Sequence, residues 1–281
     1  MSQTRSTFIK TLGLSASALM LAPLTSESAH QRADVPQSTG LRLGLASYTL
    51  RSLNLDDVIK VSKRLGLNSI ALKSMHLPLE ASADELKAMA AKVRDAGIRL
   101  YGAGVIYMKN EQEVETTFKY AVAAQLEMII GVPNHELLPL VNEKVKATNI
   151  KLAIHNHGPG DEMYSSPNDV YAKIKDLDKR IGFCIDIGHV IRIGQDPIAL
   201  IEKYKDRLYD LHIKDVDRAI AEGTPLEIGR GIIPIPKVIK ALKKINYQGV
   251  MAIEYEKDGD DPVPGLAESV GYVRGVASMV S

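Results

Sequence analysis

The stretch Gly182-Phe183-Cys184-Ile185-Asp186 is a short apolar run that ends in an acid. Near-continuous apolar residues are typical of strands in a parallel sheet that helices cover on the outside. Successive side chains of a strand point to opposite faces. We therefore expect Phe183 and Ile185 to pack against helices, and Cys184 and Asp186 to face the other way. In this setting Cys184 is a small core residue, with a nucleophilic thiol as the alternative.

Similar runs alternate with amphipathic stretches along the chain from Leu41 onward. The expected strands are Leu41–Tyr48, Ser69–Lys73, Arg99–Val105, Met128–Val132, Lys151–His155, Gly182–Asp186, Leu208–Lys214 and Gly249–Tyr255. The expected helices are Leu55–Leu65, Ala83–Ala96, Glu111–Ala124, Leu137–Thr148, Pro167–Leu177, Pro197–Tyr204, Ile235–Ile245 and Pro264–Met279. Eight strand–helix units of about thirty residues predict an α/β fold, a single-domain (β/α)₈ TIM barrel over residues 40–281. The alternative, a doubly wound open sheet, lacks a G-x-G-x-x-G motif after its first strand.

The last expected strand repeats the pattern of the first stretch. In Val250-Met251-Ala252-Ile253-Glu254, the bulky Met251 and Ile253 are expected to face the helices, which turns Glu254 inward. Asp186 and Glu254 then lie at the carboxyl ends of two strands. That end of a barrel is where catalytic residues gather.

Residues 1–39 have a different character from the rest of the chain. Arg5 and Lys10 precede the apolar run 12–22, and a polar stretch follows up to Gly40. This order predicts a signal peptide with a polar tether, and so export to the periplasm. The run Thr4–Lys10 resembles a twin-arginine motif with Ser6 at the second arginine position. The alternative is an N-terminal extension of a cytoplasmic protein.

The remaining chain contains no apolar run long enough for a transmembrane helix, which argues against stable membrane insertion. The net charge of the 281 residues is +1 at pH 7. Arg5, Lys10 and Arg32 outnumber Glu27 and Asp34 by one, so residues 40–281 carry no net charge. Nucleic-acid binders need clustered basic residues to neutralise phosphates. The expected partner is a small molecule and not a nucleic acid.

Polar residues follow four successive expected strands. These are His155-Asn156-His157, Asp186-Ile187-Gly188-His189, His212-Ile213-Lys214-Asp215 and Glu254-Tyr255-Glu256. Ionised carboxylates that converge in a barrel need a compensating cation. A shell of carboxylates and imidazoles suits one divalent metal ion, Mn²⁺, Mg²⁺, Co²⁺ or Zn²⁺. The alternative is a metal-free polar network.

The motifs D-I-G-H, H-I-K-D and E-Y-E resemble those of the xylose isomerase-like barrels, which include sugar epimerases, inosose dehydratases and endonuclease IV. Further stretches resemble an exported branch of the sugar phosphate isomerase/epimerase family: 45–48 (L-A-S-Y), 76–78 (H-L-P), 154–158 (I-H-N-H-G), 192–197 (R-I-G-Q-D-P) and 229–234 (G-R-G-I-I-P). By this resemblance Asp186, His212 and Glu254 are metal ligands. The resemblance also implies that His189 supports the metal site or contacts the substrate.

One position departs from that pattern. Many sugar epimerases of this kind have a glutamate at the end of the fifth strand, where this chain has His155. His155 can take the fourth ligand position as a neutral imidazole, and His157 can move protons. The candidate catalytic residues are therefore Glu254, His157 and His155, with Glu162 on the following loop as a further substitute for the missing carboxylate.

Other side chains near the expected barrel mouth can bind a sugar through hydrogen bonds or stacking. The candidate substrate-binding residues are Tyr48, Lys73, His76, Tyr107, His189, Arg192, Lys214, Arg230 and Glu256. Each basic residue has an alternative role in a salt bridge at the rim, and each tyrosine an alternative role in packing.

These features predict a metal-dependent isomerase or epimerase that acts on a sugar or keto-sugar. The reaction is proton abstraction next to a chelated carbonyl. Lyase or dehydratase chemistry is an alternative because of His155, and a non-catalytic exported sugar-binding barrel is another. An endonuclease IV-like enzyme is disfavoured by the uncharged body of the chain.

Overall fold

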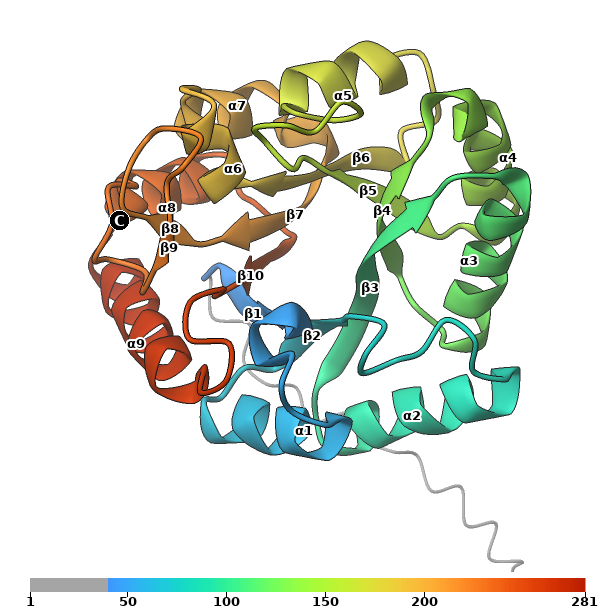
Figure 1. Cartoon of the computed structure of the whole chain (residues 1–281), viewed down its shortest axis with the longest axis horizontal. Coiled ribbons are helices and arrows are strands. Elements are labelled where there is room, and N and C mark those ends of the chain that lie inside the picture. The colour runs from blue at the N-terminus through green and yellow to red at the C-terminus, as the bar shows by residue number, and fades with distance from the viewer. Residues whose placement is uncertain (1–39, 281) are drawn as a thin grey trace, which may run out of the picture. The chain divides into compact units, whose positions relative to one another are not determined.

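A computed structural model describes residues 40–280, which form a closed barrel of eight parallel strands (Figure 1). The strands are β1 (Arg42–Ala46), β2 (Ser69–Leu72), β3 (Arg99–Met108), β4 (Met128–Pro133), β5 (Lys151–His155), β6 (Ile181–Asp186), β7 (Leu208–Ile213) and β10 (Val250–Ile253). Their order around the barrel is β1-β10-β7-β6-β5-β4-β3-β2. The predicted single-domain TIM barrel is confirmed. The signal peptide and tether predicted for residues 1–39 lie outside the described residues.

Helices surround the strands in Figure 1. They are α1 (Leu55–Arg64), α2 (Ala83–Asp95), α3 (Glu111–Ala123), α4 (Leu138–Thr148), α5 (Pro167–Ile174), α6 (Ile187–Arg192), α7 (Pro197–Lys203), α8 (Ile235–Lys244) and α9 (Val263–Met279). Local sequence explains several of their ends. Ser82 and Glu85 form a capping box at the start of α2, and Gly97, with a φ of 81°, follows its last turn. Within residues 40–280, no helix is long and apolar enough to cross a membrane.

Two layers of side chains follow from strand alternation. Phe183, Ile185, Met251 and Ile253 belong to the large apolar cluster between strands and helices. A smaller buried cluster fills the barrel interior, with Ala46, Ala71, Tyr101, Met128, Ile130, Ala153, Cys184, Val250 and Ala252. Cys184 is fully buried there, in agreement with a packing role. The inward and outward directions predicted for β6 and β10 therefore hold.

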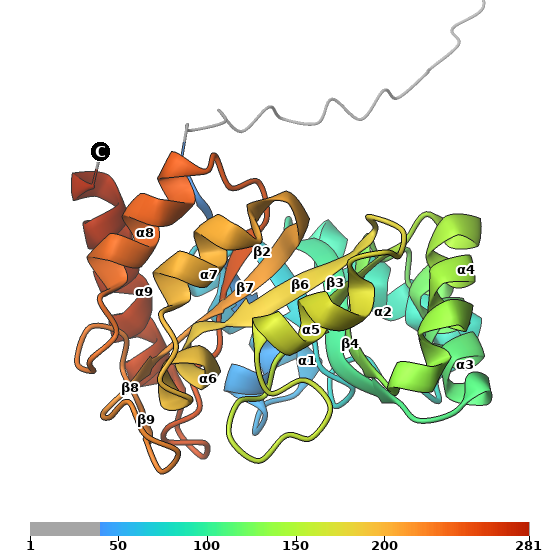
Figure 2. The same ribbon diagram turned by 90° about the horizontal axis from the view of Figure 1, so that it is seen from above.

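Helix α6 and the strands β8 (Asp215–Val216) and β9 (Pro225–Leu226) were not expected from the sequence. The short helix α6 begins directly after β6, because the Asp186 carboxylate accepts a hydrogen bond from the His189 backbone N–H (2.9 Å) and caps the helix. Between β7 and α8, the short strands β8 and β9 form an antiparallel pair. Figure 2 shows α6, β8 and β9 at the same end of the barrel.

Candidate metal centre

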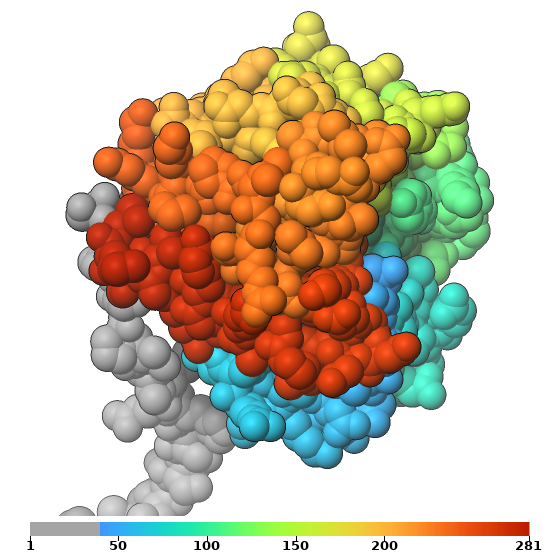
Figure 3. All heavy atoms as spheres, turned by 60° about the vertical axis from the view of Figure 1, so that its left-hand side comes forward, coloured from blue at the N-terminus to red at the C-terminus, as the bar shows by residue number. Residues whose placement is uncertain are grey.

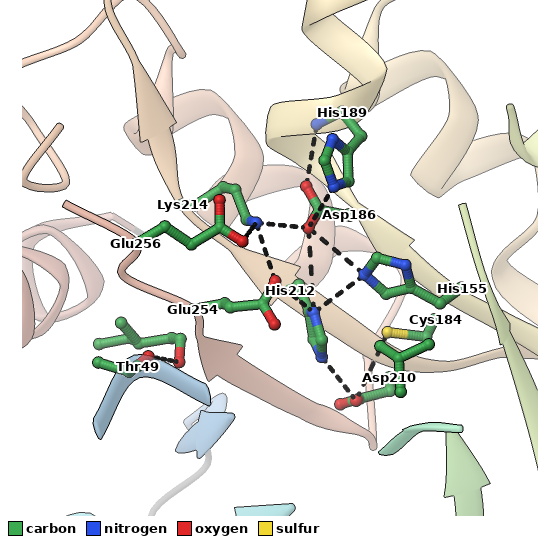
Figure 4. Close-up of polar contacts among 12 residues, drawn as sticks. Thr49, His155, Cys184, Asp186, His189, Asp210, His212, Lys214, Glu254 and Glu256 are labelled. Atoms are coloured by element: carbon green, nitrogen blue, oxygen red, sulfur yellow. Dashed lines mark hydrogen bonds and ion pairs between the residues drawn. The ribbon is translucent and has the colours of Figure 1, made fainter. Parts of the chain in front are cut away.

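Four buried side chains converge at the carboxyl ends of neighbouring strands (Figure 4). His155 ends β5, Asp186 ends β6, His212 lies on β7 and Glu254 directly follows β10. Parallel pairing sets Asp186 level with His212, so the side chains reach the same height in the barrel. One ligand atom from each of the four lies within 4.8 Å of the others. The structure thus brings together all four predicted metal ligands.

The distances suit a cation between these groups. His155 Nε2 is 3.1 Å from His212 Nδ1 and 3.5 Å from Asp186 Oδ2. His212 Nδ1 is also 3.0 Å from Glu254 Oε2. Two imidazole nitrogens and two carboxylate oxygens are a ligand set of the kind that holds Zn²⁺ or Co²⁺. The residues therefore fit a divalent metal ion.

Lys214 supplies a positive charge at the same place. Its ammonium group is 2.9 Å from Asp186 Oδ2, 2.8 Å from Glu254 Oε2 and 3.3 Å from Glu256 Oε1. Burial lowers the pKa of Lys214, but these three carboxylates outweigh burial and raise that pKa well above its usual value. The ammonium group of Lys214 therefore contacts Asp186 Oδ2 and Glu254 Oε2, two oxygens of the residues that would also bind a metal ion.

The protonation of the ligands follows from this charge pattern. Burial opposes ionisation of Asp186 and Glu254, yet nearby positive charges hold both pKa values well below the usual range. Burial is the main cause that lowers the pKa of His155 to about 4. For His212 burial also disfavours the charged ring, but Glu254 leads the carboxylates that raise its pKa to about 9. In the metal-free protein at pH 7, His155 is neutral and His212 is protonated.

His157 lies next to the ligand cluster, toward the barrel mouth. Its ring centroid is 4.5 Å from that of His155, and its side chain is 23% exposed. Its Nε2 is 2.9 Å from the hydroxyl of Tyr107, and its Nδ1 is 3.2 Å from Asp161 Oδ2. Burial lowers the pKa of His157, so its ring is available as a base at neutral pH.

Further predicted residues also contact this region. His189 Nε2 is 3.9 Å from Asp186 Oδ2, and burial lowers the pKa of His189 to about 4. Lys73 donates a hydrogen bond to the Val105 carbonyl (2.6 Å). Burial lowers the pKa of Lys73, and the charge of Glu254 opposes that change.

Some predicted residues have partners outside the cluster. The buried His76 ring bonds to Ser47 Oγ (2.8 Å) and to the Leu53 carbonyl (2.9 Å). Arg230 makes a two-pronged pair with Glu268 of α9 (2.5 and 2.7 Å).

Three more predicted residues lie on βα loops or short helical turns. Arg192 donates a hydrogen bond to the Ala221 carbonyl. The guanidinium carbon of Arg51 lies over the ring of Tyr48, 5.0 Å from the ring centroid. Glu162 is exposed on the loop between β5 and α5. Their side-chain contacts depend on loop conformation, which strand alternation does not predict.

Two residues next to the site were not predicted. Asp161 contacts His157 and lies four residues after it, on the loop that follows β5. The alternation of side chains along a strand does not extend to this loop, so it could not predict the contact. Asp210 lies two residues before His212 and therefore shares its inward direction, so alternation along β7 points to it.

Comparison with curated relatives gives partial matches. The rhizopine catabolism protein MocC of Rhizobium meliloti is 25% identical over 145 residues, 46% of this chain and 44% of that protein. An inosose dehydratase of Lacticaseibacillus casei is 23% identical over 136 residues, 43% of this chain and 45% of that protein. The match spans less than half the length of these relatives.

Solved structures match over most of the barrel. The crystal structure of the IolI protein with a bound zinc atom has a TM-score of 0.71 at 16% identity, over 86% of this chain and 99% of that one. The 3-keto-D-glucoside 4-epimerase of E. coli has a TM-score of 0.67 at 14% identity, over 84% and 99% of the two chains. At these identities the likeness concerns the fold.

The family comparison covers the part of the chain that holds the cluster. A model of the xylose isomerase-like TIM barrel matches residues 136–276, which is half of the chain and includes His155, Asp186, His212 and Glu254. The chain belongs to the xylose isomerase-like TIM barrel family.

Proposed function

We propose that the protein is a metal-dependent isomerase or epimerase that moves a proton on a sugar or keto-sugar. The observation that carries this proposal is the convergence of His155, Asp186, His212 and Glu254 beside the histidine His157. The names of the relatives and of the structural neighbours, which include an epimerase and inosose dehydratases, support sugar chemistry in this fold.

The four ligands set the place of the reaction. His155, Asp186, His212 and Glu254 would hold the divalent ion, which would supply a Lewis acid for a substrate carbonyl and so make the neighbouring C–H more acidic. The imidazoles of His155 and His212 favour Zn²⁺ or Co²⁺ over Mg²⁺, which prefers oxygen ligands. The zinc atom in the IolI structure is consistent with this choice.

His157 is the first candidate for proton transfer. The Asp161 carboxylate lies 3.2 Å from His157 Nδ1, and its negative charge favours a proton on that nitrogen, which leaves the lone pair on Nε2. That nitrogen faces the Tyr107 hydroxyl at 2.9 Å, at the exposed side of the site. A substrate that displaces this hydroxyl meets a basic nitrogen. Glu254 is the alternative base, and the Lys214 ammonium beside it can stabilise a developing oxyanion.

A dehydratase is the second candidate function. It is favoured by His155, because a site without a carboxylate at the end of β5 lacks the pair of carboxylates that would lie one on each face of the substrate. A histidine that removes a proton and later protonates a departing hydroxyl suits elimination of water. The similarity to inosose dehydratases points the same way.

One experiment separates these functions. The purified protein is loaded in turn with Zn²⁺, Co²⁺, Mn²⁺ or Mg²⁺ and incubated in D₂O with ketoses, aldoses, keto-glycosides and inososes. Deuterium at a carbon of an isomeric product supports isomerisation or epimerisation, and a product that has lost one water supports dehydration. Metal binding with neither turnover nor exchange on any substrate would contradict both and leave a sugar-binding barrel.

A further inference from the structure

Asp210 is an ionisable residue inside the barrel that the proposed reaction does not use. It lies on β7 two residues before His212 and is fully buried. Its surroundings are the apolar interior cluster that contains Tyr101, Cys184 and Val250. A carboxylate in such a place is costly unless donors surround it, so its partners indicate why it is there.

Two hydrogen-bond donors and one imidazole nitrogen face Asp210, and Figure 4 shows two of these three residues, Cys184 and His212, beside it. The Tyr101 hydroxyl donates to Oδ1 at 3.1 Å, and the Cys184 thiol donates to Oδ2 at 3.6 Å. The third group is His212, whose Nε2 is 3.7 Å from Oδ2. Within residues 40–280, His212 is the one basic side chain within 4.0 Å of this carboxylate.

When His212 binds a metal ion through one ring nitrogen, these contacts determine which nitrogen keeps its proton. A carboxylate oxygen accepts hydrogen bonds, so the imidazole nitrogen that faces Asp210 Oδ2 is the one that keeps its proton. Among the described residues, the buried Nε2 of His212 has no hydrogen-bond partner at shorter range. The opposite nitrogen, Nδ1, faces His155 Nε2 and Glu254 Oε2. A proton on Nε2 leaves the lone pair of Nδ1 for the ligand cluster.

We propose that Asp210 is a positioning residue for the metal centre: its carboxylate accepts the Nε2 proton of His212 and so aims Nδ1 at the cation. Tyr101 and Cys184 hold the carboxylate beneath the ring. Groups that orient a metal-bound histidine in this way contribute 10- to 100-fold to metal affinity in other proteins. The inference rests on the metal site of the proposed function.

The test compares zinc binding by the full-length protein with that of two variants. Asp210→Asn keeps the shape but replaces one carboxylate oxygen by a donor, and we expect its Zn²⁺ dissociation constant to rise 10- to 100-fold. Tyr120→Phe is the control, because it also removes a buried hydroxyl, but one that donates to the Leu77 carbonyl and not to Asp210 or His212. We expect less than a threefold change in its dissociation constant. Thermal unfolding of both variants measures any loss of stability separately.

A spectroscopic measurement on the wild-type protein does not depend on how the variants fold. We expect ¹⁵N–¹H correlation spectra of the zinc-loaded protein to show the His212 proton on Nε2 and the metal on Nδ1. Metal on Nε2 would overturn the assignment, as would wild-type zinc affinity in Asp210→Asn. If the wild-type protein binds no divalent metal, the proposed function fails together with this inference; if it binds zinc and Asp210→Asn binds it equally, only the role of Asp210 fails.

Discussion

His155 changes the charge of the ligand set. With a neutral imidazole at the end of β5, Asp186 and Glu254 are the two charged ligands, and their two negative charges match one divalent cation. A carboxylate at that position would add a third negative charge. In the metal-free protein, the Lys214 ammonium and the His212 imidazolium balance the same two carboxylates. Metal binding therefore replaces the positive charge of the His212 ring, while the Lys214 ammonium still contacts both carboxylates.

The pH dependence of metal binding follows from His212. Its pKa is raised from 6.5 to about 9 in the metal-free protein, so the ring is protonated at pH 7 and must lose a proton to bind metal. We expect metal affinity to rise about tenfold per pH unit between 6.5 and 9 and then level off.

The sign of the stability effect is the opposite. A raised histidine pKa stabilises the metal-free protein fully below pH 6.5, and this contribution to stability disappears as pH rises through 9.

The proton that His212 loses on metal binding can be counted. Calorimetric titrations in buffers of different ionisation enthalpy measure the protons released, and we expect one per Zn²⁺ at pH 7. Binding without proton release between pH 6 and 8 would contradict a protonated His212.

Replacement of His155 and of His157 in turn separates metal ligation from proton transfer. We expect His157→Asn to lower turnover by 10²- to 10⁴-fold and to leave metal occupancy unchanged, because His157 lies beside the ligand cluster and not in it. His155→Asn is the matched control, and it should weaken both metal binding and turnover. Metal content by atomic emission and turnover on the substrate found in the panel are the measurements. A fully active His157→Asn protein would move the proton transfer to Glu254, Glu162 or a lysine at the rim.

At the scale of elements, one carboxylate fixes the segment between β7 and α8. The buried Asp215 accepts hydrogen bonds from four backbone N–H groups at 2.9–3.0 Å, those of Val216, Gly229, Gly231 and Ile233. A side chain at Gly231 would meet Asp215 Oδ1 at 2.2 Å, so only glycine permits this approach. Figure 3 shows this segment against the start of α9 and the loop before it. The last residue of H-I-K-D thus shapes one side of the barrel mouth.

Loss of the Asp215 charge should loosen that segment. An amide has one acceptor oxygen instead of two, so Asp215→Asn leaves two of the four N–H groups poorly satisfied and should cost about 2–5 kcal/mol of unfolding free energy. Urea unfolding measures this cost, and hydrogen exchange of the Gly229, Gly231 and Ile233 amides shows where it arises. Asp217→Asn, on the same segment but partly exposed, is the control with a small expected effect. Unchanged exchange at these three amides in Asp215→Asn would contradict the anchoring role.

The same scale shows which features the sequence predicts. The strands and the inward direction of Asp186 and Glu254 follow from alternation, because one face must pack against helices. Helix α6 was missed because Asp186 both ends a strand and caps the next helix. On the loops, His76 binds Ser47 and Arg230 binds Glu268. The periodic sequence patterns of strands and helices do not predict such partners. Residues on strands are therefore predictable here, and residues on loops are not.

At the scale of the whole chain, we propose that residues 1–39 direct export and are removed. The basis is the order of basic, apolar and polar segments before the barrel. N-terminal sequencing of the protein from its native host should then find a first residue between about Ala22 and Gly40. An intact Met1 on protein recovered from the cytosol would contradict export.

Metal binding should stabilise the entire barrel, since its ligands come from the ends of β5, β6, β7 and β10. A ligand that binds only the folded state adds about 2.7 kcal/mol when its free concentration is 100 times the dissociation constant. For a domain of this size, that free energy raises the melting temperature by roughly 5–10 °C.

Glu254→Gln is the informative control for this rise in melting temperature, because it keeps the shape of the side chain and removes one charged ligand. Its zinc affinity should fall at least tenfold. Without metal, however, it also deprives Lys214 and His212 of a counter-charge. We therefore expect the metal-free variant to melt below the metal-free wild type, and the same zinc concentration to raise its melting temperature less. Equal zinc-induced shifts in the two proteins would show that Glu254 does not bind the metal. The cation would then be held by His155, Asp186 and His212 alone, and Glu254 would be left free to act as the base.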